Sequence, residues 1–424
     1  MNALTPVGVN ASAFLDRDDG LAGASQRKAA EFLRHAGLPR AGVEAWKYTT
    51  LRTLADVPFA TAQRNVNDGP VDTLLAEIET ISGLGAAANR AVFVNGYFDA
   101  ARSRLPVNVR ISTGAGADVA KDGIDPAGDV TTALNTLLAR DGLDLVVPEG
   151  VDAGCLLLVS IGITADDAPV SFHPRHRIVV EKGGRLAVLD ASVGQGHYLH
   201  NPLYDIAVAD KGYLSHARIQ AEGALAVHLA VSHAHVAADG VYDSFTLTLG
   251  GNLSRHEVHA GLTRSGAHVH VNGAQLLTGR QHGDLTSVIT HAAPGCVSRQ
   301  TVKNVLSDQA RGVFQGKILV ERVAQQTDGY QMNQALLLSD GAEIDAKPEL
   351  EIYADDVKCS HGATVGALDD DQLFYLRSRG IPDDVARSML IRAFLHDVVD
   401  EVADLRLKDS LNLAVEAWWK REAA

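Results

Sequence analysis

The most constraining feature of this sequence is a long run of short segments in which apolar and polar residues alternate, from about Leu143 to Gly366. In one segment Phe245, Leu247 and Leu249 alternate with Ser and Thr, which is the two-residue period of a strand with one dry and one wet face. Gly, Asn and Asp break the run, and no interval within it is long enough for helical crossovers. The pattern predicts an all-β core, and because no strict repeat is visible it leaves a sandwich, a barrel and a solenoid open.

Helical patterns flank this run on both sides. Ser25 to His35 has helical spacing and ends before Gly37 and Pro39, and we expect the aromatic-rich turn Glu44 to Thr49 to pack against that helix. Pro382 to Phe394 begins with Pro and two carboxylates and continues as a wide apolar stripe, which is typical of a helix. We therefore expect an N-terminal helical or mixed domain, a β core and a C-terminal helical domain, at residues 1–142, 143–366 and 367–424.

The composition disfavours nucleic acid and membranes as partners. The 424 residues carry a formal net charge of -14, whereas a chain that grips phosphates needs a basic face. The longest apolar run, Cys155 to Ile163, is far shorter than the roughly 18 residues that cross a bilayer. Met1 to Asp16 lacks the basic and apolar regions of a secretory signal. Since the cysteines are few and form no CxxC pair, we expect reduced thiols and a cytoplasmic location.

The usual enzyme signatures fail when each is tested. Gly312 to Lys317 resembles a phosphate loop, but it is one residue too short between its glycines and Ile318 replaces the hydroxyl that binds magnesium. His256 and His259 lack the spacing that places two imidazoles on one helical face. We therefore expect a chain that is not an enzyme.

Histidine pairs offer a weak metal signal. The chain has seventeen histidines, and two residues of one strand that are two apart share a face, which favours a metal. None of the pairs has an adjacent cysteine or an evident carboxylate partner, so we expect polar ladders that need only water. The pairs that stand two apart are His233/His235 and His268/His270, and a further pair, His173/His176, stands three apart.

Cys359 and His361 form the strongest candidate site. They stand two apart in an extended pattern, so the thiol and the imidazole are expected on the same face. Sulfur and nitrogen together suit iron or zinc, and Lys358 is expected to lower the pKa of the thiol. The alternative is a buried cysteine beside a histidine that bonds to the backbone. Two ligands fall short of four, so a closed site needs residues from elsewhere in the chain or from a second protein.

The segment that contains this pair resembles a known family. Lys347 to Gly366, followed by Asp370 to Ile381, is similar to the signature region of the SufB/SufD family of the SUF iron-sulfur assembly system. Glu44 to Thr49 is similar to the Glu-x-Trp-Lys-Tyr-Thr element near the N-terminus of that family. The residues Cys359 to Gly362 resemble the SufD branch, because SufB-like chains carry a Glu-His-Glu-Ala type of sequence there and usually more cysteines.

The resemblance implies a fold and a function. The fold is a right-handed parallel β-helix, over residues 143–366, between N-terminal and C-terminal helical domains. The function is that of a non-catalytic scaffold, which pairs with a SufB-like subunit through the β-helix ends and binds a SufC-like ATPase through its C-terminal helices. It leaves open whether a homodimer forms when the SufB-like partner is absent.

The resemblance also assigns residues. Cys359 and His361 are implied at a nascent iron-sulfur cluster or iron site that is shared with the SufB-like subunit. The cluster is transient there, and no stably bound cofactor is expected in the isolated chain. The residues implied in docking of the SufC-like ATPase are Pro382, Val385, Met389 and Phe394. Two other hypotheses remain, a β-helix enzyme that acts on carbohydrate and a self-contained histidine-rich metalloprotein, which predicts stoichiometric metal in the isolated chain.

Overall fold

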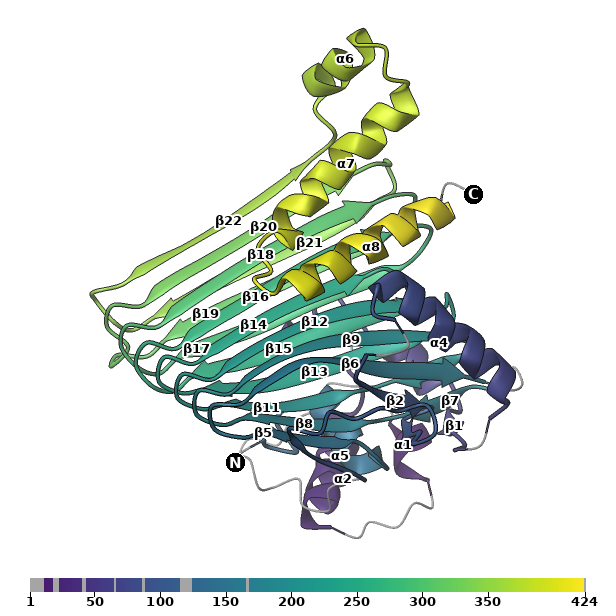
Figure 1. The fold of residues 1–424 in the computed structure, drawn as a ribbon, viewed down its shortest axis with the longest axis vertical. Coiled ribbons are helices and arrows are strands. Elements are labelled where there is room, and N and C mark those ends of the chain that lie inside the picture. The colour runs from purple at the N-terminus through teal and green to yellow at the C-terminus, as the bar shows by residue number, and fades with distance from the viewer. Residues whose placement is uncertain are drawn as a thin grey trace.

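The fold is seen in a computed structural model, which describes residues 11–17, 23–39, 43–64, 66–85, 88–114, 124–164 and 168–422. The first ten residues, part of the segment tested above for a secretory signal, lie outside the described residues. Two long sheets run side by side through the molecule, with helices packed along them and at both ends (Figure 1). No helix among the described residues is long and apolar enough to span a bilayer.

The core is a parallel β-helix, in which the chain passes back and forth between the two sheets. Each strand pairs with strands of its own sheet that come one turn earlier and one turn later. The first sheet contains, in spatial order, β4 (Arg110–Thr113), β5 (Leu143–Val147), β8 (Arg175–Val180), β11 (Leu203–Val208), β13 (Val227–Val236), β15 (Leu253–Leu262), β17 (His282–His291), β19 (Arg311–Val320) and β21 (Glu343–Ile352). The predicted β core is confirmed, and it is a solenoid.

The second sheet has the same organisation. It contains, in spatial order, β3 (Tyr97–Phe98), β2 (Arg90–Val94), β6 (Asp152–Ile163), β9 (Arg185–Gln195), β12 (Tyr213–Glu222), β14 (Val241–Thr248), β16 (His268–Leu277), β18 (Val297–Leu306), β20 (Asp328–Leu337) and β22 (Lys358–Gly366). Three short strands, β1 (Ala60–Thr61), β7 (Val170–Phe172) and β10 (Tyr198–His200), pair at one corner, where β10 also joins β13.

Alternation of side chains divides each strand between the interior of the β-helix and its outer face. In β11, Tyr204, Ile206 and Val208 point inward and belong to a buried apolar cluster. In β9, Leu189 and Ala191 point outward and are covered by helices. Between β8, β11 and β13 the parallel pairing has no register shift, so like positions stack from turn to turn. The pairing of β6 with β9 shifts between Asp152 and Cys155.

Helices cover the outer faces of both sheets. One cluster joins the second sheet to α4 (Asp68–Ser82), α7 (Asp383–Val399) and α8 (Leu405–Glu422). Another joins the first sheet to the N-terminal elements, where Trp46 is buried with Leu33 and Leu229. The packing expected for the aromatic-rich turn is therefore present. The N-terminal elements are α1 (Ser12–Leu15), α2 (Ala24–Ala36), η1 (Glu44–Trp46), α3 (Arg52–Ala55) and α5 (Val130–Leu138).

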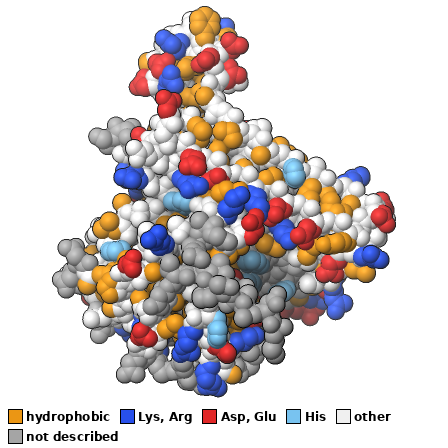
Figure 2. Space-filling view, turned by 180° about the vertical axis from the view of Figure 1, so that it is seen from behind, with side chains coloured by type: hydrophobic (Ala, Val, Ile, Leu, Met, Phe, Trp, Pro, Cys, Tyr) orange, Lys and Arg blue, Asp and Glu red, His pale blue; other side chains and the backbone are white. Residues whose placement is uncertain are grey.

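The two ends of the β-helix differ. At the N-terminal end β3 and β4 run antiparallel to their neighbours and finish the two sheets. At the C-terminal end β21 pairs only with β19, and β22 pairs only with β20, among the described residues. Beyond this end α6 (Asp370–Ser378) projects away from the body (Figure 1). Charged and hydrophobic side chains share the surface of this projection (Figure 2).

Candidate functional site

The predicted pair lies on the last strand of the β-helix. In β22, Cys359 is in register with Gly329 of β20, and His361 is in register with Gln331. The sulfur of Cys359 lies over Gly329 and belongs to a small apolar cluster around Ile318, so it points toward the interior of the last turn. By the strand period His361 projects to the same side, as the sequence predicted.

The two side chains differ in burial. Cys359 is half-buried and His361 is exposed. Burial raises the pKa of the Cys359 thiol, so the expectation that Lys358 lowers this pKa is wrong. The physical reason is the alternation of a strand, which sends the side chain of Lys358 to the opposite face of β22. Burial therefore disfavours the thiolate, which is the reactive form of a cysteine.

The open end around this pair consists of two unpaired strand edges. Both β21 and β22 have a free edge among the described residues, and such edges are templates for a further strand. Apolar side chains accompany them, since Tyr353 is 60% exposed and Val365 is 55% exposed. A solenoid end of this kind normally needs a polar cap. Cys359 and His361 thus stand at an end of the β-helix where both sheets have unpaired strand edges among the described residues.

The residues predicted for ATPase docking lie on and next to α7. Pro382 is the N-cap residue of this helix and is exposed. Val385 and Met389 are 44% and 45% exposed. Phe394 instead packs partly against the helix-covered face of the second sheet, with the ammonium of Lys303 4.4 Å from its ring centre. The exposed part of the predicted element is therefore its first half, and its docking role stays a prediction.

An exposed aromatic pair on α6 was not predicted. Phe374 is 72% exposed and Tyr375 is 56% exposed, and both belong to the projecting helix of Figure 1. Large apolar side chains at this exposure mark an interaction surface when they are clustered. The available signal was an aromatic pair within a short helix that also carries acidic residues in its first turn.

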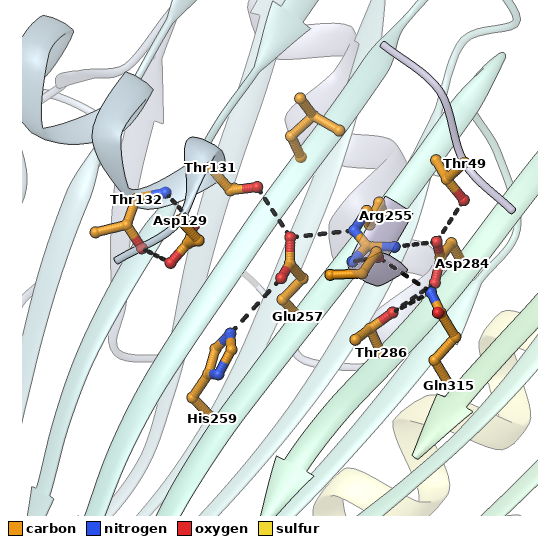
Figure 3. Close-up of polar contacts among 12 residues, drawn as sticks. Thr49, Asp129, Thr131, Thr132, Arg255, Glu257, His259, Asp284, Thr286 and Gln315 are labelled. Carbon is orange, nitrogen blue, oxygen red and sulfur yellow. Dashed lines mark hydrogen bonds and ion pairs between the residues drawn. The ribbon is translucent and has the colours of Figure 1, made fainter. Parts of the chain in front are cut away.

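A buried charged network joins the N-terminal segment to the first sheet (Figure 3). Arg255 bonds Glu257, with 3.1 Å between Nε and Oε1, and forms an ion pair with Asp284. It also donates to the carbonyl of Ala45 at 3.0 Å. Thr49 donates to the carboxylate of Asp284. These contacts hold the Glu44 to Thr49 turn against β15 and β17.

A second polar cluster lies inside the β-helix. The guanidinium of Arg218 is 3.2 Å from the carboxylate of Asp190 and stacks over Tyr204, 4.0 Å from the ring centre. His216 lies 3.5 Å from the same carboxylate. Burial lowers the pKa of His216 to about 4, which keeps that imidazole neutral near pH 7.

At least one histidine of each predicted pair contacts other side chains of the protein. His173 and His176 are buried, so the expectation of a polar ladder that needs only water is wrong for this pair. His233 stacks on His259 at 5.1 Å between ring centres and contacts Thr132 at 2.9 Å. His173 contacts Asn201 at 2.8 Å. His176 packs edge-on against Phe93. His270 lies 3.9 Å from Asp243. No group of three metal-ligating side chains is found at these pairs among the described residues.

Comparisons with known proteins find relatives over most of the chain, including the β-helix and the start of the C-terminal helices. Residues 162–394 match the sequence family described as "SUF system FeS cluster assembly, SufBD core domain". The chain is 32% identical over 390 residues to the iron-sulfur cluster assembly protein SufD of Escherichia coli, covering 89% of each chain. It is 29% identical to an iron-sulfur cluster assembly SufBD family protein of Synechocystis, covering 94% of this chain and 91% of that relative.

The chain therefore belongs to the SufBD family of the SUF iron-sulfur cluster assembly system. Within this family it is of the SufD type, which confirms the branch that the residues Cys359 to Gly362 indicated.

Proposed function

We propose that the chain is a non-catalytic scaffold subunit that pairs with a SufB-like subunit through the open end of its β-helix. The observation that carries this proposal is the pair of free edges on β21 and β22, with Cys359 and His361 facing into the end that they frame. A partner with a similar β-helix end would extend both sheets by strand addition. When that partner is absent, a second copy of this chain offers the same kind of edge.

The nascent iron-sulfur cluster is cargo at this shared surface. Thiolate and imidazole are ligands that iron accepts, and Cys359 and His361 supply one of each. Two ligands leave positions for the SufB-like subunit to fill. Pairing also changes the surroundings of the thiol, and a cation or iron brought by the partner would favour its thiolate.

The SufC-like ATPase is proposed to dock on the C-terminal helices. Pro382, Val385 and Met389 are exposed at the start of α7, and Phe374 and Tyr375 are exposed on the neighbouring helix α6. The helix α6 and the start of α7 project beyond the open end (Figure 1), so an ATPase bound there would sit next to the partner interface. Its conformational change could then act on that interface.

Coexpression with SufB-like and SufC-like chains tests the proposal. A ternary complex should copurify, and Val365→Glu should weaken the pairing with the SufB-like chain because it places a charge at an apolar edge. Cys359→Ala and His361→Ala should leave the complex intact but reduce cluster formation. Ser360→Ala is the matched control, since its side chain lies on the other face of β22.

A second set of variants tests the docking surface. Val385→Glu with Met389→Glu should release the SufC-like chain while the SufB-like chain stays bound, and Asp384→Ala on the same helix should change neither. The scaffold proposal is overturned if neither partner associates with the wild-type chain when all three are coexpressed. Normal clusters in both Cys359→Ala and His361→Ala would remove the chemical role and leave a structural one.

A further inference from the structure

Three buried side chains with metal-binding atoms meet at one corner of the β-helix, away from the open end. They are His200, Glu222 and His228, and their ligand atoms all lie within 4.8 Å of one another. No other such group of three is found in the described part of the chain. All three side chains are at most 5% exposed.

Strand pairing brings the three together. His200 on β10 is in direct register with His228 on β13, one turn later, so the two imidazoles project from neighbouring strands to the same side. Their ring centres are 4.8 Å apart and the rings are perpendicular. Glu222 ends β12 in the other sheet, and the turn after it leads directly into β13. The corner is therefore built by the fold itself and not by a mobile loop.

The distances fit ligands of one ion. His200 Nδ1 is 3.0 Å from Glu222 Oε1, and His228 Nδ1 is 2.7 Å from Oε2. Ligands that each lie about 2.0–2.2 Å from a shared ion are separated by roughly this amount. His200 Nδ1 also forms a hydrogen bond with Glu222 Oε1, so an ion would replace the proton between these two atoms. His228 Nδ1 has no hydrogen-bond partner, which leaves its lone pair for an ion.

A neighbouring side chain holds the carboxylate of Glu222 in place. Gln220 donates to Glu222 Oε2 at 3.0 Å, as residues that orient a ligating carboxylate do.

An unsatisfied polar atom lies at the corner. The Nε2 of His200 is buried without a hydrogen-bond partner. Buried polar groups are nearly always satisfied, and the exceptions call for a water or an ion. This imidazole therefore has a nitrogen that is open to a water or an ion.

A surface groove reaches the same corner. Its volume is about 450 Å³, and Glu222 is among the residues that line it, together with Gly223 and Gly250.

We propose that His200, Glu222 and His228 bind one divalent first-row transition metal ion within the isolated chain. Two imidazoles and one carboxylate are the ligand types of zinc and ferrous iron, and the triad leaves positions for water. This site uses neither Cys359 nor His361 and needs no partner, so it is independent of the proposed function. It departs from the expectation that the isolated chain holds no stably bound cofactor.

Metal titration of the full-length chain tests the site. The chain is stripped with a chelator, dialysed against Zn(II) or, without oxygen, against Fe(II), and its metal content is measured. We expect one retained equivalent. Glu222→Gln and His228→Asn should weaken binding by more than about 100-fold, since a lost ligand costs more than a lost orienting group. His291→Gln, which removes a buried histidine that contacts Ser298, is the matched control and should bind normally.

Two further readouts keep the test decisive if a variant fails to fold. The Cys359→Ala, His361→Ala double variant should retain the equivalent. X-ray absorption of the zinc-loaded wild-type chain should show only nitrogen and oxygen ligands, with imidazole scattering. A sulfur shell near about 2.3 Å would place the ion at a cysteine and overturn the proposal. So would a wild-type chain that binds no more metal than Glu222→Gln. Neither result bears on partner pairing, which copurification tests separately.

Discussion

The substitution Asp284→Ala tests how strongly the N-terminal segment is fastened to the β-helix. Asp284 is fully buried, forms an ion pair with Arg255 and accepts hydrogen bonds from Thr49 and Thr286. Its loss leaves the guanidinium of Arg255, itself 1% exposed, with Glu257 as its remaining carboxylate. Removing one member of a buried ion pair costs about 3–5 kcal/mol. We expect the free energy of unfolding to fall by that amount.

Urea unfolding followed by circular dichroism gives the global value, and hydrogen exchange of residues 43–51 reports the local one. Those amides should exchange faster, because the hydroxyl of Thr49 loses its acceptor. Asp383→Ala is the control. It pairs with Arg387 and Arg377, and all three side chains are about half exposed, so its removal should cost only about 0.3–1 kcal/mol.

A double-mutant cycle decides whether the network acts as a unit. Arg255→Met removes the buried cation, and in its presence Asp284→Ala should cost about 2 kcal/mol less than it does alone. The reasoning is refuted if Asp284→Ala costs under about 0.5 kcal/mol, or if the two substitutions are additive. Either result would mean that the buried charges are satisfied in another way.

Three further predictions concern acidity, packing and reactivity. Burial lowers the pKa of His176 to about 3, against about 6.5 in the unfolded chain. Between these pH values the unfolded chain binds a proton that the folded chain does not, so the stability contributed by neutral His176 is fully present above about pH 6.5. Below that pH the free energy of unfolding falls by up to about 1.4 kcal/mol per pH unit. Urea midpoints that stay constant from about pH 7 to 5 would contradict this. Gly194→Ala places a Cβ 2.3 Å from the hydroxyl of Tyr198 and should cost about 1–3 kcal/mol, whereas Gly366→Ala, with open space around it, should cost far less; equal unfolding free energies would show that the corner can relax. The Cys359 thiol, whose pKa burial raises, should react with iodoacetamide more slowly than a free cysteine. Mass spectrometry of its peptide measures this rate, and a rate at or above that of the free thiol would refute the low reactivity assigned to Cys359.

The sequence predicted the β core but not its architecture. Alternation such as that of Phe245, Leu247 and Leu249 reports two faces, and those faces are an interior and a helix-covered exterior. It cannot report which strands pair. The turns differ in length, and short strands such as β10 are inserted at one corner, so no strict repeat reveals the solenoid.

The candidate site was predictable only where it is local in sequence. Cys359 and His361 share a face because they are two apart on one strand, and this follows from the strand period alone. The raised pKa of the thiol depends on Ile318 and its neighbours, which only the fold brings near. His200, Glu222 and His228 come from three strands and two sheets, so strand register is needed to find them.

The free end of the β-helix also affects how local stability varies along the molecule. In a solenoid each turn contacts only its neighbours, so stability adds up one turn at a time. The last turn, with β21 and β22, has a neighbour on one side and solvent on the other. Transient opening should therefore begin there and hydrogen exchange should slow toward the middle turns. A partner that seats on this end supplies the missing neighbour, so Cys359 and His361 become most rigid at the moment of assembly.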